Sequence, residues 1–145
     1  MIRQMTMEDI SQVTAIEKEI FSDAWSYEMF EDCLKYSYYW CLVCEGEGQI
    51  KGYLITQILA GEGEIHKIGV IPSFRRKKVA DTLMKKLEEE GKRRQLSKWF
   101  LEVRESNKKA IALYLKWQFT QIDSRKNYYH NPLEDALIFQ KEQLV

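Results

Sequence analysis

Apolar residues recur along this chain with two spacings, and the spacing changes from one segment to the next. Over residues 10–21 and 79–94 they recur every three or four positions, which predicts two amphipathic helices. Over residues 98–104 they occupy every second position, which predicts a half-buried strand. Together the two spacings predict an α+β protein in which helices cover a sheet.

Local start and turn signals place the other elements. Thr6, with Asp9 three positions later, opens the first helix in the manner of a capping box, and Ser26 opens a second helix. The remaining elements are strands near residues 2–3, 39–45, 50–59, 64–70, 119–122 and 136–140, and a helix near residues 107–117. The order is β-αα-βββ-α-β-α-β-β, and glycine-bearing turns make its three central strands an antiparallel meander. No Pro- or Ser-rich linker divides it, so we expect one domain over residues 1–145.

Composition and charge narrow the classes of function. At 145 residues, of which 45% are hydrophobic, the chain can build a real core. Its 22 Lys plus Arg balance 22 Asp plus Glu, which gives no support for nonspecific binding to nucleic acid or to an anionic membrane. No apolar run approaches the ~18–20 residues that span a bilayer, and the first residues lack the apolar core of a signal peptide. We therefore expect a cytoplasmic protein, and we expect it to be a monomer.

The three cysteines fit the same compartment. Cys33, Cys41 and Cys44 make an odd number without a disulfide framework, as in reducing environments. Cys41 and Cys44 form a CxxC, but they lie in an apolar run typical of a strand, where an odd separation sends their side chains to opposite faces. We expect buried small residues there in place of a metal or redox pair, and no metal site in the protein.

The most informative segment is residues 65–80, in which an apolar strand runs into a basic turn and then into the helix that begins at Val79. Four cations cluster in this turn: Arg75, Arg76, Lys77 and Lys78. A helix N-terminus already carries partial positive charge, so cations there are unfavourable by ~0.3–1 kcal/mol each in an isolated helix. The pattern makes sense when a polyanion such as a diphosphate docks on the exposed backbone N–H groups. A solvated basic turn without a ligand explains the charges equally well, so other segments must decide.

Five further segments carry a resemblance to a known family. They are Trp25-Ser26, Leu101-Glu102-Val103-Arg104-Glu105-Ser106-Asn107, Ala110-Ile111-Ala112-Leu113-Tyr114, Asn127-Tyr128-Tyr129 and Glu134-Asp135-Ala136. With the order of elements, they make almost the whole chain resemble the GNAT superfamily of acetyl-coenzyme A (acetyl-CoA)-dependent N-acetyltransferases. Within it, the chain is most similar to the ribosomal-protein-alanine N-acetyltransferase (RimI) family. The resemblance implies an α/β three-layer sandwich, in which helices flank a mixed, mostly antiparallel sheet.

The resemblance also implies where acetyl-CoA binds as the co-substrate. The matching positions are Ile68, Gly69 and Val70 for the acetyl and pantetheine portion, Arg75, Arg76, Lys77, Lys78, Val79, Ala80 and Asp81 for the pyrophosphate, and Asn107 for the pantetheine arm. The family's loop usually reads Gln/Arg-x-x-Gly-x-Gly/Ala, and Lys78 stands where its first glycine belongs. Glycine permits a close backbone approach or an unusual φ, which a side chain opposes. We hypothesise that the ammonium groups of Lys77 and Lys78 partly offset a looser backbone fit by pairing with phosphates.

By the same resemblance, Glu102 matches the family's general base and Tyr114 its general acid. A tyrosine with a pKa of ~10 suits protonation of a thiolate with a pKa of ~8.5–9. A glutamate with a pKa of ~4.3 is a weak base unless burial raises that value or a water relays the proton. An N-terminal α-amine, with a pKa of ~7.7–8.0 against ~10.4 for lysine, is neutral roughly a few hundred times more often at neutral pH. Glu102 therefore suits a protein N-terminus better than a lysine side chain.

Each of these residues also has an interpretation without catalysis. Tyr114 lies on the apolar face of its helix and fits a core aromatic, Glu102 fits an exposed or paired carboxylate, and Asn107 fits a helix cap. His66 is expected to be an ordinary strand residue. Residues 127–129 fit turn and sheet positions, although in the family the corresponding loop lies by the peptide channel. The coincidence of several matches favours the catalytic interpretation.

The resemblance implies an enzyme that moves an acetyl group from acetyl-CoA to the N-terminal alanine of the eighteenth protein of the small ribosomal subunit. We expect direct transfer in a ternary complex, since the cysteines lie outside the segments that match the family's catalytic residues. Two alternatives stay open: a GNAT enzyme for a small amine or a lysine side chain, and a non-catalytic acyl-CoA-binding module. Retention of Glu102 and Tyr114 argues against the second alternative.

Overall fold

The computed structural model describes residues 1–75 and 78–143. Within these ranges a seven-stranded sheet has the order β1-β2-β3-β4-β5-β7-β6. Its strands are β1 (Ile2–Gln4), β2 (Tyr39–Gly46), β3 (Gln49–Leu59), β4 (Glu62–Val70), β5 (Lys98–Arg104), β6 (Thr120–Tyr129) and β7 (Glu134–Glu142). The helices are α1 (Ile10–Ile20), α2 (Tyr27–Lys35), α3 (Val79–Arg93) and α4 (Lys108–Lys116), with 3₁₀ turns at η1 (Met7–Asp9) and η2 (Pro72–Phe74).

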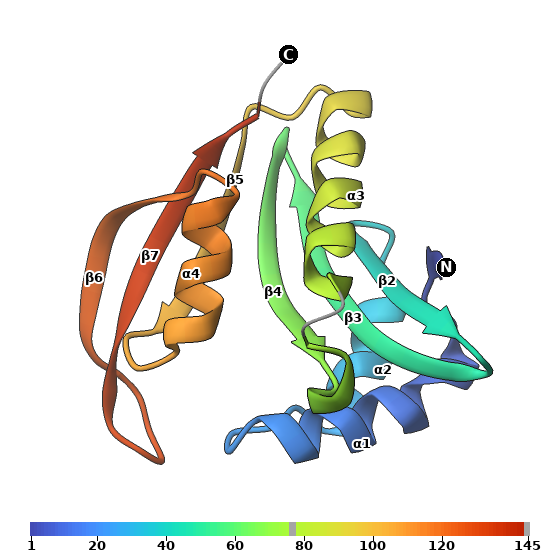
Figure 1. Ribbon diagram of the computed structural model, residues 1–145. Helices are drawn as coiled ribbons and strands as arrows, with labels where there is room; N and C mark the ends of the chain where they lie inside the picture. Colours follow the sequence, from blue (N-terminus) through green and yellow to red (C-terminus); the bar gives the residue numbers. More distant parts are fainter. Residues whose placement is uncertain (76–77, 144–145) are drawn as a thin grey trace.

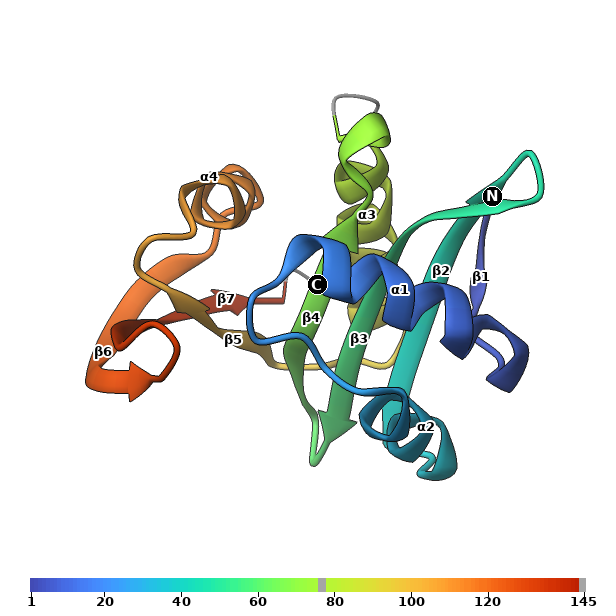
Figure 2. The ribbon, with the colours of Figure 1, turned by 90° about the horizontal axis from the view of Figure 1, so that it is seen from below.

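The layers and the order of elements agree with the sequence. Helices α1 and α2 lie on one face of the sheet, and α3 and α4 lie on the other (Figures 1 and 2). All neighbouring strands run antiparallel except β4 and β5, which are parallel. These observations confirm the predicted three-layer sandwich with a mixed, mostly antiparallel sheet.

The predicted start signals hold the helix ends. The backbone N–H of Thr6 donates to a carboxylate oxygen of Asp9 at 2.8 Å, as in a capping box. The hydroxyl of Ser26 accepts from the first turn of α2 at 3.3 Å, and the side-chain oxygen of Asn107 accepts from Ala110 N–H at 3.2 Å. Asn107 is therefore a helix cap, as the interpretation without catalysis predicted. Across the described residues, no helix combines the length and the apolar character that crossing a bilayer requires.

The sheet separates two hydrophobic cores. One lies under α3 and α4 and includes Trp99, Leu101 and Val103, which confirms the alternation predicted for β5. The other lies under α1 and α2. Cys44 belongs to the first core and Cys41 to the second, each less than 9% exposed. The CxxC cysteines are thus buried on opposite faces, as their odd separation predicted.

The prediction for β6 was wrong in length. A strand was expected near residues 119–122, but β6 runs through Thr120–Tyr129 and includes the Asn-Tyr-Tyr segment at its end. Among the described residues it is the edge strand and pairs with β7 alone, so nearly all its residues are exposed. An exposed edge strand needs no apolar alternation, and its sequence therefore carries little strand signal.

The two parallel strands separate part-way along their length. Between β4 and β5 the paired positions run only from Glu62–Lys98 to Ile65–Leu101. At the same level β4 contains a bulge, because the register with β3 passes from Lys67 to Ile65 and leaves His66 without an opposite residue. A bulge bends its strand and redirects side chains, so the ends of β4 and β5 diverge.

Candidate active site

A cavity of ≈200 Å³ lies where β4 and β5 diverge. Its walls come from the α1–α2 connection, β4, β5, α4 and the end of β6. The lining residues are Phe21, Asp23, Trp25, His66, Lys67, Ile68, Glu102, Val103, Arg104, Asn107, Ala110, Tyr114 and Tyr129. Glu102 and Tyr114, the two residues matched to acid–base roles, both line this cavity. Ile68 and Asn107 line it as well.

Glu102 is a partly buried carboxylate that lines the cavity. Its side chain is 26% exposed and faces away from Leu101 and Val103, which are buried under α3 and α4. The guanidinium of Arg125 lies 3.8 Å from one of its oxygens. The hydroxyl of Tyr128 hydrogen-bonds Glu102, and this bond raises the pKa of Tyr128. Glu102 is thus held in place by β6 while remaining within reach of a molecule in the cavity.

Tyr114 approaches the cavity from the opposite side, on α4. Its side chain is 5% exposed, and its ring packs against Phe119 at 5.7 Å and Phe139 at 6.5 Å between centroids. Burial raises the pKa of Tyr114 above its usual value, so its phenol stays protonated at neutral pH. Tyr114 is both a core aromatic and a cavity residue. Burial therefore moves the pKa of Tyr114 further from that of a thiolate than the usual tyrosine value on which the sequence argument was based.

The residues matched to the pyrophosphate lie at the start of α3. Lys78 is the N-cap, with φ of 61° and ψ of 22°, a left-handed conformation that favours glycine. The backbone therefore makes the turn expected of glycine, although the residue is lysine. The side chain of Asp81 accepts hydrogen bonds from Lys116 and from the Trp117 indole, each at 2.9 Å, so it links α3 to α4. Arg76 and Lys77 lie outside the described residues.

The end of β4 is closely packed from behind. A Cβ on Gly69 would lie 2.4 Å from Cζ of Tyr53, so only glycine fits beside that ring. Ile68 lines the cavity, whereas Val70 is buried in the core under α3. Arg75 Nε donates to the carbonyl of Val70 at 3.3 Å and ties the basic turn to the strand.

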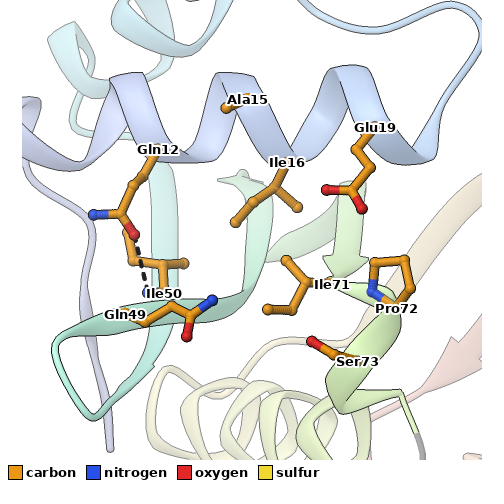
Figure 3. A pocket seen from close by; sticks show the side chains of 9 residues that line it. All are labelled: Gln12, Ala15, Ile16, Glu19, Gln49, Ile50, Ile71, Pro72 and Ser73. Atoms are coloured by element: carbon orange, nitrogen blue, oxygen red, sulfur yellow. Dashed lines mark hydrogen bonds between the residues drawn. The ribbon is translucent and has the colours of Figure 1, made fainter.

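A larger hollow elsewhere contains none of the predicted residues. It measures ≈470 Å³ and lies between α1 and the segments around β3 and η2 (Figure 3). Gln12 on α1 accepts a hydrogen bond from Ile50 N–H there at 3.1 Å (Figure 3). The other lining residues are Ala15, Ile16, Glu19, Gln49, Ile71, Pro72 and Ser73. The smaller cavity is therefore the candidate active site.

Comparison with known proteins places this geometry in a family. The model of the acetyltransferase (GNAT) family matches residues 6–119. The chain belongs to the GNAT family. It is 35% identical over 138 residues, covering 94% of the chain and 91% of its relative, to a Bacillus subtilis (strain 168) protein named "putative ribosomal protein bS18-alanine N-acetyltransferase". A Salmonella typhimurium relative named ribosomal protein bS18-alanine N-acetyltransferase is 31% identical, with 90% of this chain and 88% of that protein covered.

A solved structure extends the likeness over the whole chain. The crystal structure of the ribosomal-protein-S18-alanine N-acetyltransferase from Escherichia coli matches with a TM-score of 0.93 and 28% identity. The match covers 100% of this chain and 94% of that one. It therefore includes β6 and β7, which the family model does not reach.

This GNAT chain also has cavity residues that the sequence did not reveal. Arg104 and Tyr129 meet there, with the guanidinium carbon 4.4 Å from the ring centroid. Burial raises the pKa of Tyr129 to about 12, with a further contribution from Glu102. Tyr129 belongs to the segment 127–129 and Arg104 to the segment 101–107, both of which carry the family resemblance. Their contact could not be predicted, because only the fold brings these two segments together.

Lys67 and His66 are two further cavity residues that the sequence did not identify. Lys67 pairs at 2.9 Å with Glu17, whose side chain is fully buried, and its ammonium lies 4.0 Å from the Phe21 ring centroid. His66, expected to be an ordinary strand residue, lies at the bulge and lines the cavity. Burial lowers the pKa of His66 below its usual value, partly opposed by nearby carboxylates. A bulge is a local change of strand register, and no pattern of residues in the sequence predicted one at His66.

Proposed function

We propose that this GNAT protein transfers an acetyl group from acetyl-CoA to the α-amine of the N-terminal alanine of ribosomal protein bS18. The single observation that carries the proposal is that Glu102 and Tyr114 line one cavity at the point where β4 and β5 diverge. The names of the relatives supply the acceptor. The proposal assigns the other matched residues to acetyl-CoA: Ile68, Gly69, Val70, Arg75, Arg76, Lys77, Lys78, Val79, Ala80, Asp81 and Asn107.

The residues at the start of α3 fit a phosphate-bearing ligand. The left-handed backbone at Lys78 reproduces the turn for which glycine is usual, and its side chain is exposed. The first N–H groups of a helix have no partner within that helix, and they attract anions. Acetyl-CoA would supply an activated acetyl thioester. Asp81 is committed to α4 through its side chain, so its contribution to binding is through the backbone.

Glu102 and Tyr114 divide the proton transfers. As the new N–C bond forms and the C–S bond breaks, the nitrogen loses a proton and the departing sulfur gains one. Glu102 accepts the proton from the amine directly or through a water. Tyr114, buried and protonated, donates to the sulfur. Its raised pKa keeps the phenol protonated, so it can hydrogen-bond the developing thiolate, but it also makes the phenol a reluctant proton donor, so we expect the proton to follow late.

The chemistry supports direct transfer to an amine. None of the three cysteines lines the cavity. Burial raises the pKa of Cys33 to about 11 and that of Cys41 to about 12, so neither forms a thiolate nucleophile at neutral pH. An α-amine is neutral far more often than a lysine side chain, so a carboxylate base suffices for it.

The test pairs each role with a matched control. Glu102→Gln and Tyr114→Phe should each lower kcat by about 10²–10⁴-fold with an alanine-leading peptide and acetyl-CoA, measured as thiol release. Glu105→Gln and Tyr36→Phe, both at exposed positions, should match the parent enzyme. Unchanged rates in Glu102→Gln and Tyr114→Phe would overturn the assigned roles.

Acceptor choice needs its own measurement. The same assay with polyamines and with a peptide blocked at its N-terminus but carrying lysine compares the alternative acceptors. The proposal requires the free alanine N-terminus to give the highest kcat/KM. Failure of every acceptor, with coenzyme A still bound, would instead favour a non-catalytic acyl-CoA-binding module.

We further propose that residues 1–145 act as one domain and as a monomer in the cytoplasm, where ribosomal proteins are made, with no metal. Light scattering at working concentration tests the monomer. Full activity after treatment with a chelator tests the independence from metal.

A further inference from the structure

Arg104, the last residue of β5, joins segments that are far apart in the sequence. Its side chain is only 15% exposed. Nη2 donates to Asp23 in the α1–α2 connection at 2.9 Å and to the carbonyl of His130 at 3.0 Å. Nη1 donates to Glu134 at 3.1 Å and to the carbonyl of Pro132 at 3.0 Å. One guanidinium therefore links the α1–α2 connection to the β6–β7 turn.

The links lie on one particular side of the cavity. Arg104 and Glu102 occupy alternate positions of β5 and face away from Val103, which is buried under α3 and α4. Asp23 and Tyr129 line the cavity together with Arg104, and Tyr129 covers the guanidinium at 4.4 Å. The described residues matched to the pyrophosphate lie just before α3 or in its first turn, and α3 covers the other face of the sheet. The side that Arg104 organises is thus the one from which an acceptor reaches Glu102.

Arginine suits this task for a geometric reason. Its planar guanidinium fixes the directions of its N–H groups, so two carboxylates and two carbonyls held by it are fixed relative to one another. A lysine ammonium offers three donors from one atom and cannot reproduce the four contacts. Glu134 extends the arrangement, since its second oxygen accepts from Ser106 N–H at 2.6 Å, just before α4.

We propose that Arg104 is a positioning residue for the acceptor peptide. It holds the α1–α2 connection and the β6–β7 turn at a fixed separation, and these two segments form the walls of the acceptor entrance. The proposal deepens the proposed function, on which it rests, and assigns Arg104 no proton transfer. A purely structural role would lower stability without distinguishing the two substrates.

The first experiment separates the substrates by kinetics. Arg104→Lys keeps the charge and loses the planar fork, and Arg104→Gln loses both. Each should raise the KM for an alanine-leading peptide by about tenfold, because the two walls of the acceptor entrance are no longer held at a fixed separation. The KM for acetyl-CoA should stay within about twofold of the parent value. Arg93→Lys is the matched control, because Arg93 makes a two-pronged pair with Glu90 on the exposed side of α3.

The second experiment needs no turnover. Amide hydrogen exchange should rise together in residues 21–26 and 128–134 of Arg104→Lys, and it should be unchanged in Arg93→Lys. Asp23→Asn should raise exchange in the same two segments, and combining it with Arg104→Lys should add little. If Arg104→Gln fails to fold, Arg104→Lys and Asp23→Asn carry both readouts.

Different results would contradict the positioning role of Arg104 and the proposed function. An unchanged peptide KM in Arg104→Lys, or exchange that rises in only one of the two segments, overturns the positioning role. If the parent enzyme does not acetylate the peptide, the proposed function is wrong. The hydrogen-exchange measurement would still test whether Arg104 couples the two segments, because it needs no turnover.

Discussion

The two sides of the cavity are built in different ways. Toward α3 and α4, the structure relies on backbone geometry and apolar packing: a left-handed turn at Lys78 and a core centred on Trp99. Toward α1 and α2, charged side chains from distant segments add to an apolar core: the pair of Glu17 with Lys67 and the contacts of Arg104. A ligand that is the same for every member of a family, such as acetyl-CoA, can be bound by one contiguous strand, turn and helix. The proposed acceptor side is assembled from segments that only the fold brings together.

The largest effect expected from this contrast is at Glu17. Its fully buried carboxylate accepts from Lys67 at 2.9 Å, from the Tyr53 hydroxyl at 2.5 Å and from Trp25 N–H at 3.0 Å. Glu17→Leu leaves the ammonium without a counter-charge and should lower the free energy of unfolding by about 3–5 kcal/mol. Urea unfolding measures this, and Glu89→Gln, which breaks an exposed pair with Lys86 on α3, should change stability by less than ~1 kcal/mol.

A double variant sharpens the interpretation. Glu17→Leu with Lys67→Met replaces the pair by apolar side chains and should recover most of the lost stability, because the buried charge is gone. A single Glu17→Leu variant as stable as the parent would show that the α1/α2 side does not depend on buried charge. The contrast between the two sides would then be wrong.

Lys78 tests the other side, with a smaller effect. Its left-handed backbone is unfavourable by about 1–2 kcal/mol for a residue with a Cβ, while glycine loses about 0.5–1 kcal/mol of chain entropy. Lys78→Gly should therefore raise the free energy of unfolding by up to about 1 kcal/mol, and Lys78→Ala, which keeps the Cβ, should not. Calorimetric titration with coenzyme A separates charge from backbone: unchanged affinity in Lys78→Ala would remove the proposed role of the ammonium group.

The same contrast explains what could be predicted from the sequence. The strand and the helix between Ile65 and Arg93 are close together in the sequence, and each boundary has a local signal, so the bounds of β4 and α3 were predicted closely. Arg104 lies 81 residues from Asp23 and 30 from Glu134, and no periodicity connects them. Glu17 gave no signal either, since a glutamate in an amphipathic helix is normally solvated. Networks of side chains from distant segments are therefore the part of the structure that could not be predicted from the sequence.

The smallest effect concerns His66, at the bulge between the two sides. It faces Trp25 and Tyr39 at ring-centroid distances of 6.2 and 5.7 Å, and its Nε2 lies 3.1 Å from the side-chain oxygen of Gln57. Burial lowers its pKa, while the carboxylates of Glu64 and Glu102 act in the opposite direction.

Below pH ~6.5 the unfolded chain therefore takes up a proton at His66 more readily than the folded protein does, so stability falls as pH drops through that range. The contribution of this one group to the slope is at most about 1.4 kcal/mol per pH unit. The variant with glutamine at this position, H66Q, should flatten the loss of unfolding free energy between pH ~7.5 and ~5.5, measured in urea. H130Q, at the exposed second histidine, should keep the parent slope. Equal slopes in H66Q and the parent would show that the bulge does not hold a neutral imidazole between the two sides.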